Sequence, residues 1–208
     1  MYNLEEQTKT AGAYIMYNGY LLFMFGFSND KSSTDLGVVR FGGHKENNEN
    51  VLSCVKREVK EETSLDSEFY LNNIVYSYKL KEDVFKKIDS YSIVTETSEI
   101  LPMLLELKED NSLSLMYLLK GFGKLEPSME TQGILLLRFK DLKDICTKQI
   151  SFKDYIDNGG KYVVTKKLKK VENNPKKYKL IPRAQLLFIN KFLQVNPKLI
   201  NYFFDDNV

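Results

Sequence analysis

The sequence predicts an α/β protein of the α+β type, in which strands surround one amphipathic helix. Residues 11–17 and 20–27 are apolar, aromatic runs on either side of Asn18-Gly19, a dipeptide typical of type I′ hairpin turns. Residues 36–41 form a third apolar run, and a helical pattern begins at Asn50. The order strand, strand, strand, loop, helix therefore opens the chain, and residues 113–119 and 134–139 add later strands.

The helix is predicted from its cap and its apolar face. Asn50 is a favourable N-cap, because its side-chain oxygen accepts hydrogen bonds from free amides of the first turn. Leu52, Val55 and Val59 follow at helical spacing, so one face of the helix is expected to be buried.

Three carboxylates crowd another face of this helix. Glu58, Glu61 and Glu62 lie at positions i, i+3 and i+4, within one turn of each other. Like charges at this spacing repel, and anions are unfavourable near a helix C-terminus. A hard divalent cation relieves both effects, since Mg²⁺ and Mn²⁺ prefer oxygen ligands. The alternative is a solvated acidic face with Lys56 and Lys60 as partners.

The wider stretch resembles the signature of the Nudix hydrolases. The matching positions are Gly43, Glu49, Arg57, Glu58, Val59, Glu61, Glu62 and Leu65. Ser64 departs from the pattern, because the family has Gly there, and Ser in a left-handed cap costs roughly 1 kcal/mol. Phe41 stands where many members have Pro, whereas Gly42-Gly43 is kept.

The resemblance implies a fold, a metal site and a set of catalytic residues. The fold is an α/β/α sandwich with a mixed β-sheet. The metal is Mg²⁺ or Mn²⁺, and the implied ligands are Glu58, Glu61, Glu62 and the backbone carbonyl of Gly42. The implied catalytic residues are Glu61, Arg57, Glu49 and Glu130. Arg57 is expected to brace the carboxylates through a charge-assisted pair with Glu49, with a simple surface salt bridge as the alternative.

Glu130 is a prediction from the topology of the family. Many Nudix enzymes carry a further Glu in the loop before the last strand of the domain, and residues 121–130 occupy that place. Glu126 and Glu130 both lie there. We favour Glu130, because Pro127 pushes Glu126 toward extended backbone near the strand end. Two solvated loop acids are the alternative.

The implied reaction is metal-dependent hydrolysis of a pyrophosphate linkage in a nucleoside diphosphate joined to another moiety. The alternative is a catalytically weak, Nudix-like module that binds a nucleotide or RNA and regulates a partner. The retained carboxylates favour the enzyme. The nucleoside diphosphate derivative is not determined, although Tyr14, Tyr17 and residues 81–110 are candidate recognition elements.

Composition excludes several classes of protein. The chain has 208 residues and a formal net charge of +2, so its global charge indicates no particular partner. Cys54 and Cys146 lack metal-ligand spacing and indicate a reducing compartment, with Cys54 expected to be a small packing residue. No apolar run is long enough to span a membrane, and the N-terminal segment does not resemble a signal peptide. A cytoplasmic protein is expected, and a homodimer is left open.

Residues 1–150 are predicted to form the hydrolase domain, and residues 151–208 a lysine-rich connector and C-terminal helices packed on it. Residues 151–158 suit a short helix capped by Ser151. Residues 161–179 hold eight lysines and one acid, which leaves RNA binding open, although a solvated connector is favoured because few aromatics interleave. A further helix is expected with Pro182 in its first turn.

Overall fold

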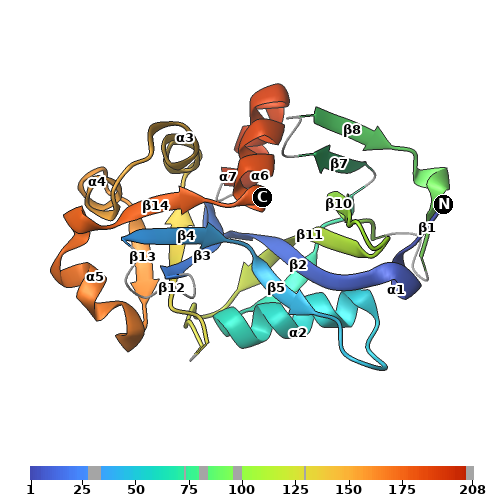
Figure 1. The fold of residues 1–208 in the computed structure, drawn as a ribbon, viewed down its shortest axis with the longest axis horizontal. Coiled ribbons are helices and arrows are strands. Elements are labelled where there is room, and N and C mark those ends of the chain that lie inside the picture. The colour runs from blue at the N-terminus through green and yellow to red at the C-terminus, as the bar shows by residue number, and fades with distance from the viewer. Residues whose placement is uncertain (28–33, 73, 80–83, 96–99, 129, 205–208) are drawn as a thin grey trace. The chain divides into compact units, whose positions relative to one another are not determined.

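The computed structural model describes residues 1–27, 34–72, 74–79, 84–95, 100–128 and 130–204 (Figure 1). The chain forms two compact units. The first unit holds Met1–Ile15, Phe41–Glu61 and Leu65–Gly123, and the second unit holds Met16–Arg40, Glu62–Ser64 and Lys124–Val208. Each unit contains strands and helices, so the predicted α+β class is confirmed.

The first unit is built around helix α2 and a group of strands. Its helices are α1 (Leu4–Gln7), η1 (Ser90–Ser92) and α2 (Val51–Thr63), the last of which ends in the second unit. Its strands are β1 (Tyr2–Asn3), β2 (Thr8–Tyr17), β5 (Phe41–His44), β6 (Asp66–Phe69), β7 (Val75–Lys79), β8 (Val84–Ile88), β9 (Ile93–Val94), β10 (Leu104–Leu107) and β11 (Leu113–Phe122). Strand β10 is antiparallel to β11 and parallel to β7, so the pairing is mixed, as predicted.

Strand β5 brings the glycine pair beside β2. Gly42 is in register with Gly12, and Gly43 with Ala11, in an antiparallel ladder. This pairing holds the backbone of the glycine pair in place just before the loop that leads to α2.

Helix α2 forms for the local reasons that the sequence suggests. The Ser53 amide donates to Asn50 Oδ1 at 2.8 Å, which confirms the predicted cap. Val55 and Val59 are fully buried, whereas Leu52 is half-buried, so the predicted apolar face is confirmed at two of its three residues. The helix ends at Thr63, and Ser64 follows it with a φ of 63°, the left-handed conformation that favours glycine.

The second unit contains a five-stranded arrangement in the order β13-β12-β3-β4-β14. Its strands are β3 (Tyr20–Phe27), β4 (Asp35–Val39), β12 (Gly133–Leu137), β13 (Lys161–Val164) and β14 (Lys179–Pro182). Adjacent strands are antiparallel except β4 and β14, which are parallel. Asn18 and Gly19 precede β3 with φ of 48° and 72°, the positive values that a type I′ turn requires.

Helices pack around these strands (Figure 1). They are α3 (Phe139–Lys148), α4 (Phe152–Asp157), α5 (Lys169–Asn173), α6 (Ala184–Val195) and α7 (Ile200–Phe204), with short 3₁₀ turns η2 (Lys166–Leu168), η3 (Pro175–Lys177) and η4 (Pro197–Leu199). Helix α6 contacts both β4 and α3. The Asp154 amide donates to Ser151 Oγ at 3.1 Å, which confirms the predicted start of α4.

The lysine-rich segment, residues 161–179, begins in β13 and reaches the first residue of β14. Strand β13 pairs with β12, and β14 pairs with β4, so the segment runs from one outer strand of the second unit to the other. Its apolar residues Leu168 and Val171 are fully buried. Pro182 ends β14, and α6 begins two residues later than expected, at Ala184.

None of the helices formed by the described residues has the length and apolar character needed to cross a membrane.

Candidate active site on helix α2

One guanidinium holds three carboxylates together in the first unit. Arg57 Nε and Nη2 donate to the two carboxylate oxygens of Glu49 at 2.9 and 3.1 Å. Arg57 Nη1 donates to Glu58 Oε1 at 2.9 Å and to Glu61 Oε2 at 3.1 Å. Nη2 also donates to the His44 carbonyl at 3.1 Å. The predicted contact between Arg57 and Glu49 is therefore confirmed, and it has the bidentate geometry typical of strong pairs.

This arrangement shifts the protonation equilibria of the pair. The hydrogen bond from Arg57 holds the pKa of the Glu49 carboxyl below its ordinary 4.5, and the same bond raises the pKa of the Arg57 guanidinium. The side chains are only 24% and 13% exposed, so water screens this pair less than a surface ion pair.

Arg57 also changes how the acidic helix face is explained. Its guanidinium offsets part of the repulsion between the Glu58 and Glu61 carboxylates, because both accept a hydrogen bond from the positively charged Arg57 Nη1. Crowding of acids on α2 is therefore compatible with a folded helix before any cation binds. Arg57 sets the orientation of Glu58 and Glu61, two of the three predicted carboxylate ligands.

The glycine pair on β5 leaves room for this group. A side chain at Gly43 would occupy the space taken by the Glu58 carboxylate. Gly42 has a φ of 125°, a conformation that residues with a side chain rarely adopt. Glycine is therefore required at both positions, at Gly43 by the close approach of Glu58 and at Gly42 by the backbone conformation.

The donor set suits a hard divalent cation, because it consists of carboxylate and carbonyl oxygens. In the parts of the chain that the structure describes, no group of three or more His, Cys, Asp or Glu side chains has an arrangement that could hold a metal ion. Glu58 and Glu61 are brought together on Arg57, whereas Glu62 lies in the last turn of α2, in the second unit. The predicted ligand set consequently stays a prediction.

A loop of the second unit is attached to that last turn. Thr131 Oγ1 donates to the Glu62 carbonyl at 3.1 Å, and the Glu126 amide donates to the Thr63 carbonyl at 3.0 Å. Ser64 Oγ donates to the Glu126 carbonyl at 3.1 Å. The loop that carries both candidate acids is thus tied to the end of the signature helix by backbone and hydroxyl contacts.

The two candidate acids of this loop differ in their partners. Glu126 forms an ion pair with Lys124. Glu130 has an exposed side chain, and its amide donates to Ser128 Oγ at 3.2 Å. The choice of Glu130 over Glu126 stays a prediction.

Three other sequence-predicted features have clear positions. Cys54 is fully buried beside the site, and burial raises the pKa of its thiol to about 12, so it is a packing residue rather than a nucleophile. Tyr14 is also fully buried, which removes it as a candidate for substrate recognition. Tyr17 is half-buried, and parts of the candidate segment 81–110 lie outside the described residues.

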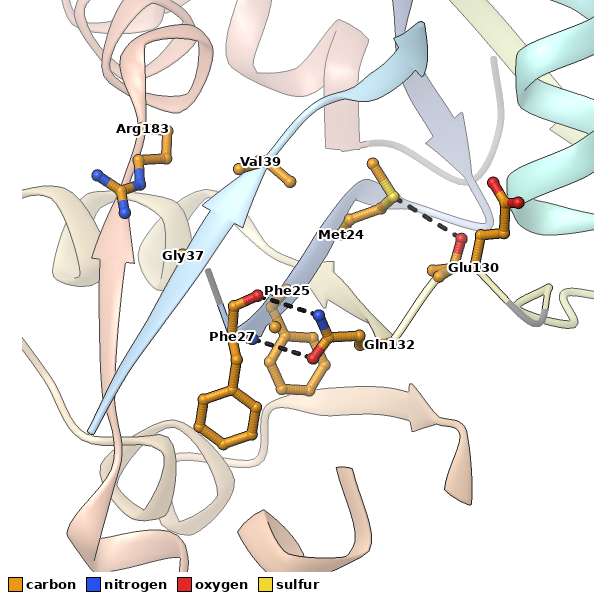
Figure 2. Close-up of a pocket in the computed structure, with 10 residues that line it drawn as sticks. Met24, Phe25, Phe27, Gly37, Val39, Glu130, Gln132 and Arg183 are labelled. Carbon is orange, nitrogen blue, oxygen red and sulfur yellow. Dashed lines mark hydrogen bonds between the residues drawn. The ribbon is translucent and has the colours of Figure 1, made fainter. Parts of the chain in front are cut away.

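A pocket that the sequence did not predict lies in the second unit, on strands β3 and β4 (Figure 2). Gly26 and Gly37 form part of its floor, and Gln132 and Arg183 stand beside it. The only local signal was a glycine inside each predicted strand, since such glycines often mark close approach of a ligand or of other atoms.

Comparison with known proteins finds solved Nudix-family structures that are similar to this chain. No protein-family model matches the sequence, and no curated protein matches it. A Nudix-family hydrolase from Clostridium perfringens is 17% identical, with a TM-score of 0.45 over 66% of this chain and 85% of that chain. A C. elegans Ap4A hydrolase is 16% identical, with a TM-score of 0.41 over 73% and 90% of the two chains. An ADP-ribose pyrophosphatase from Streptococcus suis is 17% identical, with a TM-score of 0.36 over 64% and 74%.

Proposed function

We propose that this protein hydrolyses a pyrophosphate linkage in a nucleoside diphosphate joined to another moiety, with Mg²⁺ or Mn²⁺ as cofactor. The observation that supports this most directly is Arg57, which orients Glu58 and Glu61 while Glu49 anchors it. Such an arrangement keeps acids that prefer a divalent cation close together while a guanidinium offsets their mutual repulsion.

The proposed ligands are Glu58, Glu61, Glu62 and the carbonyl of Gly42. A divalent cation held there would neutralise phosphate charge and lower the pKa of a bound water. Arg57 holds two of the carboxylates in place, and Gly43 leaves the space that the Glu58 carboxylate occupies.

Glu130 is the proposed general base. Its carboxylate would take a proton from the attacking water, whose oxygen forms a new bond to phosphorus. The phosphorus–oxygen bond of the linkage breaks, and two phosphorylated products leave. Glu61 and Arg57 contribute by orientation and charge. This assignment is supported by the attachment of the Glu130 loop to the carbonyls of Glu62 and Thr63.

A substrate panel tests the proposal. Purified protein would be incubated with nucleoside diphosphate sugars, dinucleoside polyphosphates, nucleoside triphosphates and capped RNA, with Mg²⁺, Mn²⁺ or EDTA. We expect phosphorylated products from at least one class with metal and none with EDTA. Nucleotide binding without turnover of any compound would instead support the alternative, a catalytically weak regulatory module.

A further inference from the structure

The pocket of the second unit has a floor made by two neighbouring strands, and we call it the β3–β4 pocket. Gly26 on β3 is directly in register with Gly37 on β4, and Met24 is in register with Val39. Register partners point to the same face of a sheet. These four residues therefore form one surface. It is apolar at Met24 and Val39, and the side chains of Gln132 and Arg183 lie against it at Gly26 and Gly37.

One wall is a glutamine with a fixed orientation. Gln132 Nε2 donates to the Phe27 carbonyl at 3.0 Å, and the Phe27 amide donates to Gln132 Oε1 at 3.0 Å (Figure 2). A side chain at Gly26 would collide with Gln132. The glycine thus allows the amide to lie over β3, and both contacts keep it there.

The other wall is Arg183, on the opposite side of β4 from Gln132 (Figure 2). Its side chain is exposed, and a side chain at Gly37 would come within 3.3 Å of Arg183 Nε. Among the described residues, none forms a hydrogen bond or ion pair with this guanidinium, whose five donors are therefore available to a ligand.

The size of the pocket matches one ring system. Its volume is about 170 Å³, and a cavity of roughly 150 Å³ accommodates one benzene ring. Met24 and Val39 line the pocket and supply apolar contacts for a flat group. Arg183 adds donors for ring acceptors and a plane that stacks on aromatic rings.

The pocket is linked to a proposed metal ligand within the same unit. Thr131, which lines it, is buried and donates through its hydroxyl to the Glu62 carbonyl at 3.1 Å. Glu130 also lines the pocket, across from Arg183 (Figure 2). A ring in the pocket would therefore lie near the end of α2 that carries Glu62.

We propose that the β3–β4 pocket binds the nucleobase of the substrate, with Arg183 donating hydrogen bonds to ring acceptors. This inference rests on the proposed function in one respect, namely that the substrate is a nucleotide. It assigns base recognition to Gly37, Met24, Val39 and Arg183, which lie outside the signature stretch.

Binding of free nucleosides tests the inference without metal or turnover. Saturation-transfer NMR in EDTA would compare adenosine, guanosine, cytidine and uridine with ribose. Gly37→Leu fills the floor, Arg183→Ala removes the donors, and Lys179→Ala, at an exposed position on adjacent β14, is the matched control. Thermal melting would verify that each variant is folded.

We expect the wild type to bind at least one nucleoside and not ribose. Both pocket variants should weaken that binding by about tenfold or more, as expected when contacts to a charged donor or a whole subsite are lost, and Lys179→Ala should match the wild type. The inference is overturned if ribose binds equally well, if no nucleoside binds, or if folded Gly37→Leu and Arg183→Ala both bind like the wild type. Because no metal is present, nucleoside binding that depends on the pocket would stand even if the hydrolase proposal failed.

Discussion

The carboxylate of Glu58 occupies the space that a side chain at Gly43 would need. This relationship joins strand β5 to helix α2, because Glu58 is also held by Arg57 Nη1 at 2.9 Å. The position of a proposed metal ligand therefore depends on the absence of a side chain fifteen residues earlier in the chain.

Gly43→Ala is expected to lower turnover by about 10²-fold, the effect typical of a misplacement of roughly 1 Å in an active site. The added methyl group would displace the Glu58 carboxylate. Alanine can adopt the backbone conformation of Gly43, whose φ is not positive. Steady-state kinetics with saturating Mg²⁺ would measure the loss. Ser53→Ala, at an exposed position on the same helix, is the control, and equal turnover in the two variants would contradict the role given to this contact.

Glu62→Gln is expected to lower turnover by about 10²-fold or more, which corresponds to about 2.7 kcal/mol of transition-state stabilisation. The change removes the charge of a proposed ligand but keeps its shape, and the backbone carbonyl that anchors Thr131 is unaffected. Folding should stay intact. Metal-dependent turnover and a thermal melt would be measured beside Glu68→Gln, which is exposed on β6. Full Mg²⁺-dependent activity in Glu62→Gln would show that the metal assignment is wrong.

Glu130→Gln and Glu126→Gln form a matched pair from one loop. Glu130→Gln should lower turnover and flatten the acidic limb of the pH–rate profile, because the general base is lost. Glu126→Gln should be nearly silent, since Glu126 pairs with Lys124. Rates measured across pH for both variants decide between them. The reverse pattern would move the role to Glu126, and two silent variants would remove the loop from the mechanism.

The Arg57–Glu49 pair is expected to make stability depend on pH below neutrality. Its hydrogen bond lowers the Glu49 pKa from the ordinary 4.5, so the stabilisation is fully present above pH 4.5. It is lost as pH falls through the lowered pKa. Glu49→Gln should consequently be less stable than the wild type at pH 7, by a margin that shrinks toward low pH. Urea unfolding in EDTA would measure this margin, and a margin independent of pH would contradict the explanation.

The exposed lysines between residues 161 and 179 define a basic surface whose affinity for RNA, if it binds any, must be electrostatic. Replacing Lys166, Lys169 and Lys176 by Gln should reduce the slope of log affinity against log salt by about three, roughly one unit per lost phosphate contact. Fluorescence titration of a labelled RNA at 50 to 200 mM salt, with Lys87→Gln as control, would measure it. Absence of binding at low salt would leave the surface with a structural role alone.

The sequence by itself determined the elements whose formation depends on near neighbours. Asn18-Gly19 specifies its turn through positive φ values, and Asn50 caps α2 through an amide three residues away. The contact of Arg57 with Glu49 was expected from the resemblance of this stretch to the Nudix signature, in which both residues have matching positions. In each case the interaction spans few residues, so spacing and residue type suffice.

Only the tertiary structure decided the features that depend on distant partners. Composition does not show that β13, at the start of the lysine-rich segment, pairs with β12, or that β14, which begins at the end of the segment, pairs with β4. The β3–β4 pocket likewise brings Gly37, Gln132 and Arg183 together from separate parts of the chain. Strand pairing supplies backbone hydrogen bonds irrespective of side-chain charge, and Leu168 and Val171 of the segment are fully buried. The positions of these residues were therefore set by burial and pairing across the fold, which no local pattern of charge or hydropathy encodes.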